Sequence, residues 1–402
     1  MSPLSGEFTP SGRVVIFGEG VDRLRRGERN VYLKWLRRRE GAVEPGDLVE
    51  VVDDSGEFLA WGFYEGIGAM AVRVLSLDRE DRPSEDWLRS SLEGALRLRE
   101  RLNLGNFFRL VHSEADGLPG LIVDVYSSLG VVTSTSVGMD RRLGVIAEIL
   151  SELLGLDAVY ARNDARTRRE VGLPTWRGRL IGEAGPTAQI DEGGVRFEVD
   201  VIRGQKTGFF IDQRENRLLL QRYAPRGGRI LDLFSYTGGF GLHALAGGAA
   251  EAVLVDESDY AVEAALRNAE LNGLSGRVSA VRSRVKEFLE SARERGDRYD
   301  AVVVDPPALV PSRERLSMGL KTYVAVNAAA MEVLEPEGLM ISTSCSQFVD
   351  AGRLRRVLLT AASRAGRRVR FLGGVLGQSP DHPVDPLHPW TGYLKGFALA
   401  VE

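Results

Sequence analysis

Residues 229–257 read RILDLFSYTGGFGLHALAGGAAEAVLVDE, and this stretch decides the fold. A short apolar run ends at Asp232, a glycine-rich loop and a helical segment follow, and a second apolar run ends at Asp256. The same alternation continues along the chain, with the apolar runs DAVVVDPP at 300–307 and LMISTSC at 339–345. Such alternation is typical of an α/β protein with a doubly wound parallel sheet, in which ligands bind at the carboxyl ends of the strands.

The glycine loop after Asp232 favours S-adenosylmethionine over a dinucleotide. A dinucleotide turn has the spacing G-x-G-x-x-G, which brings a helix N-terminus against a pyrophosphate, whereas the glycines here stand at 238, 239 and 241. Asp232 at the strand end suits a cationic amino group and would repel a phosphate. Asp256 at the next strand end suits the two hydroxyls of a ribose. S-adenosylmethionine has an amino acid part, a ribose and no phosphate, so the sequence predicts a methyltransferase.

Two further strand ends point to the reaction. The run 302–304 leads into Asp305, Pro306 and Pro307, and successive prolines end the strand and hold Asp305 at the sheet edge. Asp-Pro-Pro at this place is typical of methyltransferases that act on a planar base. The single cysteine of the chain, Cys345, follows the next strand. Because neighbouring strands lie about 5 Å apart, Asp305 and Cys345 are predicted to line one pocket.

A thiolate at this place suits methylation of carbon 5 of a pyrimidine. Carbon 5 is too electron-poor to attack a sulfonium methyl group, but a thiolate that adds to carbon 6 turns carbon 5 into an enamine carbon. We therefore predict Cys345 as a covalent nucleophile and Asp305 as the ligand of the exocyclic amino group of a cytosine. The alternative for Cys345 is a small buried hydrophobic residue. Asp381 and His382 are weak candidates for the base that removes the carbon 5 proton, with surface loop residues as the alternative.

The length of 402 residues predicts two or three domains. Short alternating runs with glycine turns at the start of the chain predict a small β-barrel, and a polar break after Leu77 predicts a boundary. The expected domains are a barrel that binds RNA at 1–76, a central α/β linking domain at 77–190, and a Rossmann-like methyltransferase domain at 191–402.

Residues 13–41 hold nine basic and four acidic side chains, although the whole chain carries a net charge of −4. Tyr32 and Trp35 lie among them, and cations beside aromatic rings suit phosphate contact and base stacking. The sequence therefore predicts an RNA-binding face, with a solvated surface helix as the alternative. The predicted RNA-binding residues are Arg25, Arg26, Arg29, Lys34, Arg37 and Arg38.

Other classes of site are disfavoured. One cysteine and four histidines, without H-x-x-x-H or C-x-x-C spacing, argue against a metal centre. No apolar run reaches the ~18 residues of a membrane helix, and residues 1–13 lack the apolar stretch of a signal peptide. We therefore expect a cytoplasmic protein that binds no metal and no membrane.

Longer motifs resemble one family over nearly the whole chain, the PUA-domain-containing 23S ribosomal RNA cytosine-5 methyltransferases. The matching stretches are HSEADGLPGLIVDVY (112–126), GQKTGFFIDQRENR (204–217), ILDLFSYTGGFGLHA (230–244), VDES (255–258), RNAELNG (267–273), VVDPPAL (303–309), STSCSQ (342–347), DHPV (381–384) and YLKG (393–396). The resemblance implies a PUA barrel, a central domain and a Rossmann-like catalytic domain. It also implies S-adenosylmethionine as donor, a cytosine of large-subunit ribosomal RNA as substrate, and a homodimer.

The resemblance further implies roles for individual residues. Those that would bind the cofactor are Asp232, Phe234, Tyr236, Gly238, Asp256, Gln213 and Asp305. Those that would frame the substrate pocket are Phe210, Asp212, Arg217, Pro306 and Pro307, again with Gln213. Two stretches depart from the family pattern: 281–284 lacks the acid that contacts adenine, and 26–32 replaces a Gly-His-Pro-Trp element of the barrel.

Two alternative functions remain open at this point. One is methylation of a guanine nitrogen in RNA, which would use Asp305-Pro306-Pro307 and no thiol. The other is an RNA-binding assembly factor whose methylation is incidental.

Overall fold

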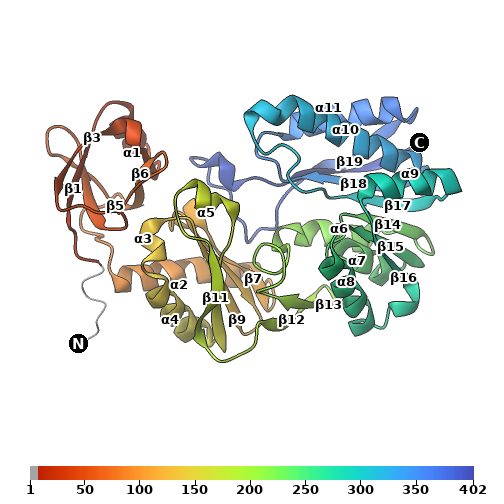
Figure 1. Cartoon of the computed structure of the whole chain (residues 1–402), viewed down its shortest axis with the longest axis horizontal. Coiled ribbons are helices and arrows are strands. Elements are labelled where there is room, and N and C mark those ends of the chain that lie inside the picture. Colours follow the sequence, from red (N-terminus) through yellow and green to blue (C-terminus); the bar gives the residue numbers. More distant parts are fainter. Residues whose placement is uncertain (1–7) are drawn as a thin grey trace. The chain divides into compact units, whose positions relative to one another are not determined.

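The computed structural model describes residues 8–402 and divides into two compact units (Figure 1). Unit 1 holds the described chain up to Ile190, with Val199–Phe210 and Pro380–Gly392. Unit 2 holds Asp191–Glu198, Ile211–Ser379 and Tyr393–Glu402. The first seven residues, which belong to the predicted domain 1–76 and to the stretch without a signal peptide, lie outside the described residues. The predicted boundaries at 76/77 and 190/191 stay predictions.

Unit 1 begins with a six-stranded sheet of order β2-β6-β5-β4-β1-β3 and the short helix α1 (Glu19–Arg25). Its strands are β1 (Gly12–Ile16), β2 (Asn30–Tyr32), β3 (Leu36–Gly41), β4 (Leu48–Val52), β5 (Phe58–Ile67) and β6 (Met70–Ser76). β2 and β3 stand at opposite ends of this order, yet only the 3₁₀ turn Leu33–Trp35 joins them in the chain. Because so few residues span at most ~14 Å, the sheet must curl round, and the predicted small barrel is confirmed.

A second sheet of unit 1 has the order β11-β10-β9-β8-β7. It contains β7 (Phe107–His112), β8 (Leu121–Tyr126), β9 (Leu129–Ser134), β10 (Ala158–Asn163) and β11 (Trp176–Gly182), with helices α2 (Glu85–Leu102), α3 (Val137–Asp140), α4 (Leu143–Leu154) and α5 (Arg166–Glu170). The side chain of Ser84 caps α2 by accepting from Trp87 N. Leu88 and Leu92 of α2 and Ile146 and Leu150 of α4 are buried in the core of this layer.

Residues 380–392 also belong to unit 1, although they come near the end of the chain. Arg109 N donates to Asp381 Oδ2 at 2.9 Å, and Arg29 N donates to His388 Nε2 at 3.0 Å. Both bonds tie a late segment to early parts of the chain, so unit 1 is not a continuous piece of sequence.

The sheet of unit 2 has the order β16-β15-β14-β17-β18-β20-β19. Its strands are β14 (Arg229–Leu233), β15 (Glu251–Asp256), β16 (Val278–Arg282), β17 (Tyr299–Val304), β18 (Leu334–Ser344), β19 (Val369–Leu376) and β20 (Lys395–Val401). Five of these strands pair in parallel, and β20 runs antiparallel between β18 and β19. A two-stranded hairpin, β12 (Thr187–Glu192) and β13 (Val195–Asp200), precedes this sheet in the chain.

Six helices cover the two faces of this sheet (Figure 1). They are α6 (Arg214–Tyr223), α7 (Gly239–Ala246), α8 (Asp259–Leu271), α9 (Val285–Arg295), α10 (Leu316–Glu332) and α11 (Ala351–Arg364). Apolar residues of α9, α10 and α11 share one buried cluster with the strands, which include Val302 and Val304 of β17. The predicted doubly wound α/β fold is therefore confirmed, and β14, β15, β17 and β18 end at one edge of the sheet.

Within residues 8–402, no helix combines the length and apolar composition that a membrane span requires. Over the same residues, no group of three or more His, Cys, Asp or Glu side chains is arranged to hold a metal ion.

Candidate active site

Asp232, at the end of β14, presents a carboxylate oxygen that lacks a partner. Its Oδ2 accepts a hydrogen bond from Gly241 N at 2.9 Å, while Oδ1 has no hydrogen-bond partner within the described residues. The residue is only 1% exposed. Burial, assisted by the charges of Asp305 and Asp256 and opposed by the Gly241 bond, raises the pKa of Asp232 to about 7. A buried unpaired oxygen is costly, and the ammonium group of S-adenosylmethionine would supply the missing partner.

The loop between β14 and α7 has an unusual backbone. Phe234, Tyr236 and Gly238 have φ angles of 61°, 47° and 83°. The left-handed region is uncommon for residues other than glycine, and such strain persists only where surrounding contacts hold it. Here Tyr236 N donates to Asp256 Oδ2 at 2.9 Å, and Ser235 N donates to Val255 O at 3.0 Å. The loop is thereby held at the carboxyl end of β15, which brings the predicted cofactor residues together.

Asp256 anchors this loop and keeps capacity for a ligand. Its Oδ1 accepts from Ser258 N at 3.0 Å, and each oxygen retains a second lone pair for a ribose hydroxyl. After β16, where an acid would contact adenine, the side chains are basic. Arg282 pairs with Asp259 at 3.0 Å, and Arg284 is exposed. A carboxylate close to this place in the described chain is therefore that of Asp259, and it is already paired with Arg282.

Asp305, directly after β17, joins three elements. Its Oδ1 accepts hydrogen bonds from Gln213 Nε2 at 2.8 Å and from Thr343 Oγ1. Gln213 stands just before α6, and Thr343 lies in β18, so the two bonds fix the carboxylate from both sides. Asp305 and Gln213, both predicted site residues, are therefore brought together.

The end of β18 presents alternate side chains to α10. Ser342 Oγ donates to Asn327 Oδ1 at 2.7 Å. Tyr323 OH is hydrogen-bonded to Ser344 Oγ at 2.8 Å and to Ser346 Oγ at 3.0 Å. The three serines are spaced by two residues, as expected for one face of an extended strand.

Thr343 lies on the other face, because its hydroxyl donates to Asp305. Side chains alternate along extended backbone, so Cys345, two residues further on, falls on the same face as Thr343. Cys345 is half-buried there. The cysteine and Asp305 therefore lie at the carboxyl edge of two neighbouring parallel strands, and that they line one pocket stays a prediction.

Lys395 is a residue of this site that the sequence did not predict. It opens β20 and stands opposite Ser344 of β18. Its Nζ donates to Ser346 O at 2.5 Å and to Tyr393 O at 2.9 Å, and the residue is 8% exposed. Burial lowers the pKa of Lys395 to about 8, while the negative charge of Cys345 opposes this shift. The only signal in the sequence is the YLKG stretch, which carries no role by itself.

Residues 168–388 match the model of an S-adenosylmethionine-dependent methyltransferase family. The chain belongs to this family. Residues 14–77 match a PUA-like domain, in agreement with the curled sheet at the start of unit 1.

Curated relatives cover almost the whole methyltransferase. Ribosomal RNA large subunit methyltransferase I of Photobacterium profundum is 37% identical over 385 residues, which cover 94% of this chain and 96% of that protein. The protein of the same name from Escherichia coli is 34% identical over 91% of this chain and 93% of its own length. A solved structure described as a SAM-dependent methyltransferase from Streptococcus mutans has a TM-score of 0.80 at 20% identity, with 96% of this chain and 99% of that chain covered. That likeness supports the fold.

Arg217, predicted for the substrate pocket, is buried beneath the glycine loop of the methyltransferase. Its guanidinium pairs with Glu192 through bonds of 2.5 and 2.9 Å, and His243 Nε2 lies 3.0 Å from the same carboxylate. The Arg217 side chain also lies so close to Gly239 that a Cβ there would approach its Cδ to 2.9 Å. Arg217 therefore packs against the glycine loop at Gly239.

The other predicted pocket residues have different surroundings. Asp212 is buried, and its Oδ2 accepts from Tyr393 OH at 2.7 Å. Pro306 is buried and Pro307 exposed, next to Asp305. Phe210 belongs to unit 1, where Lys206 Nζ lies 4.3 Å from the centre of its ring. Their contact with substrate stays a prediction.

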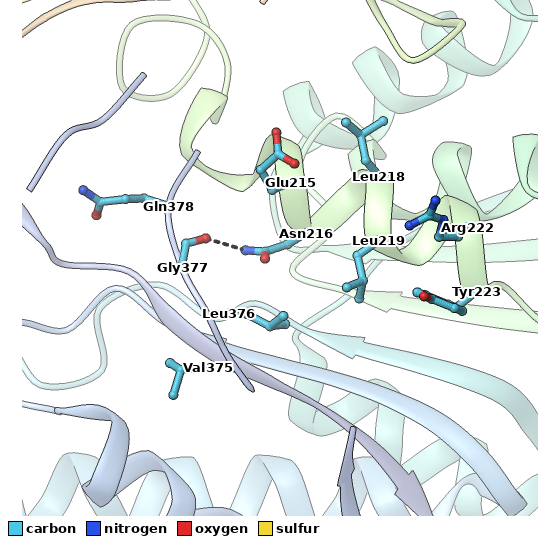
Figure 2. Close-up of a pocket in the computed structure, with 10 residues that line it drawn as sticks. All are labelled: Glu215, Asn216, Leu218, Leu219, Arg222, Tyr223, Val375, Leu376, Gly377 and Gln378. Atoms are coloured by element: carbon cyan, nitrogen blue, oxygen red, sulfur yellow. Dashed lines mark hydrogen bonds between the residues drawn. The ribbon is translucent and has the colours of Figure 1, made fainter. Parts of the chain in front are cut away.

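A cavity of about 520 Å³ opens beside this site, between α6 and residues 375–378 (Figure 2). Asn216 forms part of its wall and donates to Gly377 O at 3.2 Å and to Gln213 Oε1 at 2.6 Å. Because Gln213 also donates to Asp305, the amide side chains of Asn216 and Gln213 connect the wall of the cavity to the carboxyl edge of the sheet.

Half of the six predicted RNA-binding residues of unit 1 are paired with carboxylates. Arg25 pairs with Glu57 at 2.7 Å, Arg37 with Asp54 at 3.1 Å, and Arg38 with Glu40 at 2.8 Å. The remaining three make other contacts: Arg29 Nη1 donates to Leu75 O, Arg26 Nε donates to Asp22 O, and Lys34 Nζ lies over the Trp35 ring. A role of this surface in RNA binding therefore stays a prediction.

Proposed function

We propose that this methyltransferase transfers a methyl group to carbon 5 of a cytosine in large-subunit ribosomal RNA, with Cys345 as covalent nucleophile. The observation that carries the proposal is the position of Cys345 directly after β18, on the same side as Thr343, whose hydroxyl donates to Asp305. The open oxygen of Asp232 lies at the end of β14, the strand next to β17. The relatives named as ribosomal RNA large subunit methyltransferase I support the choice of substrate.

The proposed cofactor residues fit S-adenosylmethionine, which supplies an electrophilic methyl group on its sulfonium when bound. Asp232 would hold the ammonium group and Asp256 the ribose hydroxyls. The strained loop, with Phe234, Tyr236 and Gly238, would line the cofactor site.

The chain's own residues then perform covalent catalysis on the base. Cys345 Sγ forms a bond to carbon 6 of the cytosine, and the electron pair displaced toward carbon 5 makes that carbon nucleophilic. After carbon 5 gains the methyl group, a base removes its proton, the Sγ–carbon 6 bond breaks and the ring double bond returns. Asp305, fixed by Gln213 and Thr343, would bind the exocyclic amino group and orient the ring.

Lys395 gives this nucleophile its reactive form. The attacking species is the thiolate, and a free cysteine has a pKa of about 8.5. A buried ammonium beside the sulfur stabilises the thiolate and lowers the thiol pKa. The backbone carbonyls of Ser346 and Tyr393 accept hydrogen bonds from that ammonium and hold it in place.

The reaction is tested with methyl-labelled S-adenosylmethionine and unmodified large-subunit ribosomal RNA. The RNA is digested to nucleosides and read by mass spectrometry, for the wild type and for Cys345→Ala. We expect label in 5-methylcytidine with the wild type and none with the variant, which should still bind the cofactor. Label in methylguanosine that persists in Cys345→Ala would contradict the proposal and favour the thiol-independent alternative.

We further propose that the enzyme acts in the cytoplasm and as a homodimer. An RNA substrate from the ribosome is met in the cytoplasm. A homodimer, as the family resemblance implies, would have twice the mass of the 44.1 kDa chain in light scattering coupled to size-exclusion chromatography.

A further inference from the structure

A second basic surface lies in unit 2, in a groove of about 570 Å³ between α10 and α11. Four cationic side chains and no acidic one line this groove. Its lining residues are Ser317, Leu320, Lys321, Val324, Arg353, Arg356, Val357, Thr360 and Arg364. We call these residues the α10–α11 groove.

Most of the cations in the α10–α11 groove have no ionic partner. Arg353 pairs with Asp350 at 2.9 Å. Within residues 8–402, no carboxylate pairs with Lys321, Arg356 or Arg364, and all three are exposed. This contrasts with the basic surface of unit 1, where half of the predicted RNA-binding residues are already in ion pairs. Uncompensated cations in a groove attract a polyanion, because its binding releases condensed counterions.

The groove begins at the catalytic edge. Helix α10 follows β17 and the Asp305 loop, and α11 follows β18 and Cys345, so the first turns of both helices lie at the carboxyl edge of the sheet. The positive ends of both helix dipoles add to the attraction there. Arg353 and Arg364 bound one side of the groove and are eleven residues apart on α11, which corresponds to about 16 Å at 1.5 Å per residue.

We propose that the α10–α11 groove binds the phosphate backbone of the RNA strand beside the target nucleotide. The inference rests on the proposed function only in that the substrate is RNA. The cations would contact phosphates, while Leu320, Val324 and Val357 give the floor an apolar surface on which sugars and bases can pack. A negatively charged protein segment and a second copy of this chain are the other possible occupants, and the charge pattern favours the nucleic acid.

The test is the salt dependence of RNA binding without cofactor. The triple variant Lys321→Gln, Arg356→Gln, Arg364→Gln is compared with Lys286→Gln, Arg293→Gln, Arg295→Gln on α9, which removes the same charge from cations that already pair with Glu290, Glu332 and Asp297. Binding to a fragment of unmodified large-subunit ribosomal RNA is measured by filter retention between about 50 and 200 mM salt.

We expect the groove variant to lose about 2 from the slope of log K against log salt, since each lost contact to a single strand removes about 0.7. The α9 variant should keep the wild-type slope, and both should keep the wild-type melting temperature and cofactor affinity. A wild-type slope in the groove variant would overturn the proposal, as would an equal loss in both variants. A groove variant that changed only the oligomeric state would also overturn it, in favour of an interface between copies.

The identity of the methylated nucleoside is measured in a separate experiment, and it does not affect the salt dependence of RNA binding. RNA binding that depends on the groove, together with a product other than 5-methylcytidine, would leave the groove proposal standing and end the proposed cytosine chemistry.

Discussion

Asp232 buries a carboxyl group with a pKa of about 7 and leaves one oxygen without a partner. In the ligand-free enzyme this group gains a proton as the pH falls through 7, and a neutral carboxyl group attracts an ammonium group weakly. We therefore expect the affinity for S-adenosylmethionine to fall as the pH is lowered from 8 to 6, approaching tenfold per pH unit. Calorimetric titration over this range tests it. Asp232→Asn should bind weakly at every pH; an equal pH dependence in both proteins would contradict the assignment.

The effect of Lys395 on the thiol can be measured directly, because Cys345 is the only cysteine of the chain. The charge of Cys345 acts on Lys395 of β20 and on Tyr323 of α10, and Lys395 also feels the charge of Asp350, which precedes α11. In Lys395→Met the cation is lost, so the pH midpoint of Cys345 alkylation by iodoacetamide should rise by about 1 unit or more. Lys395→Arg keeps the charge and should keep a low midpoint. The same midpoint in wild type and Lys395→Met would show that the lysine is only structural.

At the scale of elements, helix α7 packs so closely on β15 that Gly241 has no room for a side chain. A Cβ at this position would lie 2.2 Å from Leu254 Cδ2 and 3.5 Å from Asp232 Oδ2. Gly241→Ala should therefore cost about 1–3 kcal/mol in the free energy of unfolding and weaken cofactor binding, because α7 must move away from Asp232. Gly144→Ala in α4, where nothing lies within 4 Å, is the matched control and should leave stability equal or higher. Thermal unfolding of both variants tests the prediction. Equal melting temperatures of the two variants would contradict it.

The strands and helices around the cofactor were predictable because they are local. Each apolar run, its glycine or proline turn and its polar strand end lie within a few residues of one another, and Asp232, Asp256, Asp305 and Cys345 all fall where their spacing indicated. Lys395 could not be found this way, since it reaches Cys345 only through the antiparallel pairing of β18 with β20. The ion pairs of Arg25 and Arg37 are also non-local, so sequence charge overstated the free charge of that surface.

At the scale of the whole molecule, the segment 380–392 is part of unit 1. Asp381 and His382 are not surface loop residues, and their role in proton transfer stays a prediction. Both are buried; Asp381 Oδ2 accepts from Arg109 N, and Asp381 Oδ1 lies 2.8 Å from His382 Nδ1. Asp381→Ala leaves a buried N–H without an acceptor, so it should lower the free energy of unfolding by about 1–3 kcal/mol. Denaturant unfolding measures this. Full stability combined with complete loss of methyl transfer would instead assign Asp381 to the chemistry.

The central claim is a covalent bond between Cys345 and a cytosine, and RNA that carries 5-fluorocytidine at the target position tests it most directly. Fluorine at carbon 5 removes the proton whose loss releases the enzyme, so the methylated adduct cannot break down. With S-adenosylmethionine present, we expect a protein–RNA complex that survives denaturing electrophoresis and maps by mass spectrometry to the Cys345 peptide, absent in Cys345→Ala. Methyl transfer to unmodified RNA without any such complex would contradict the account.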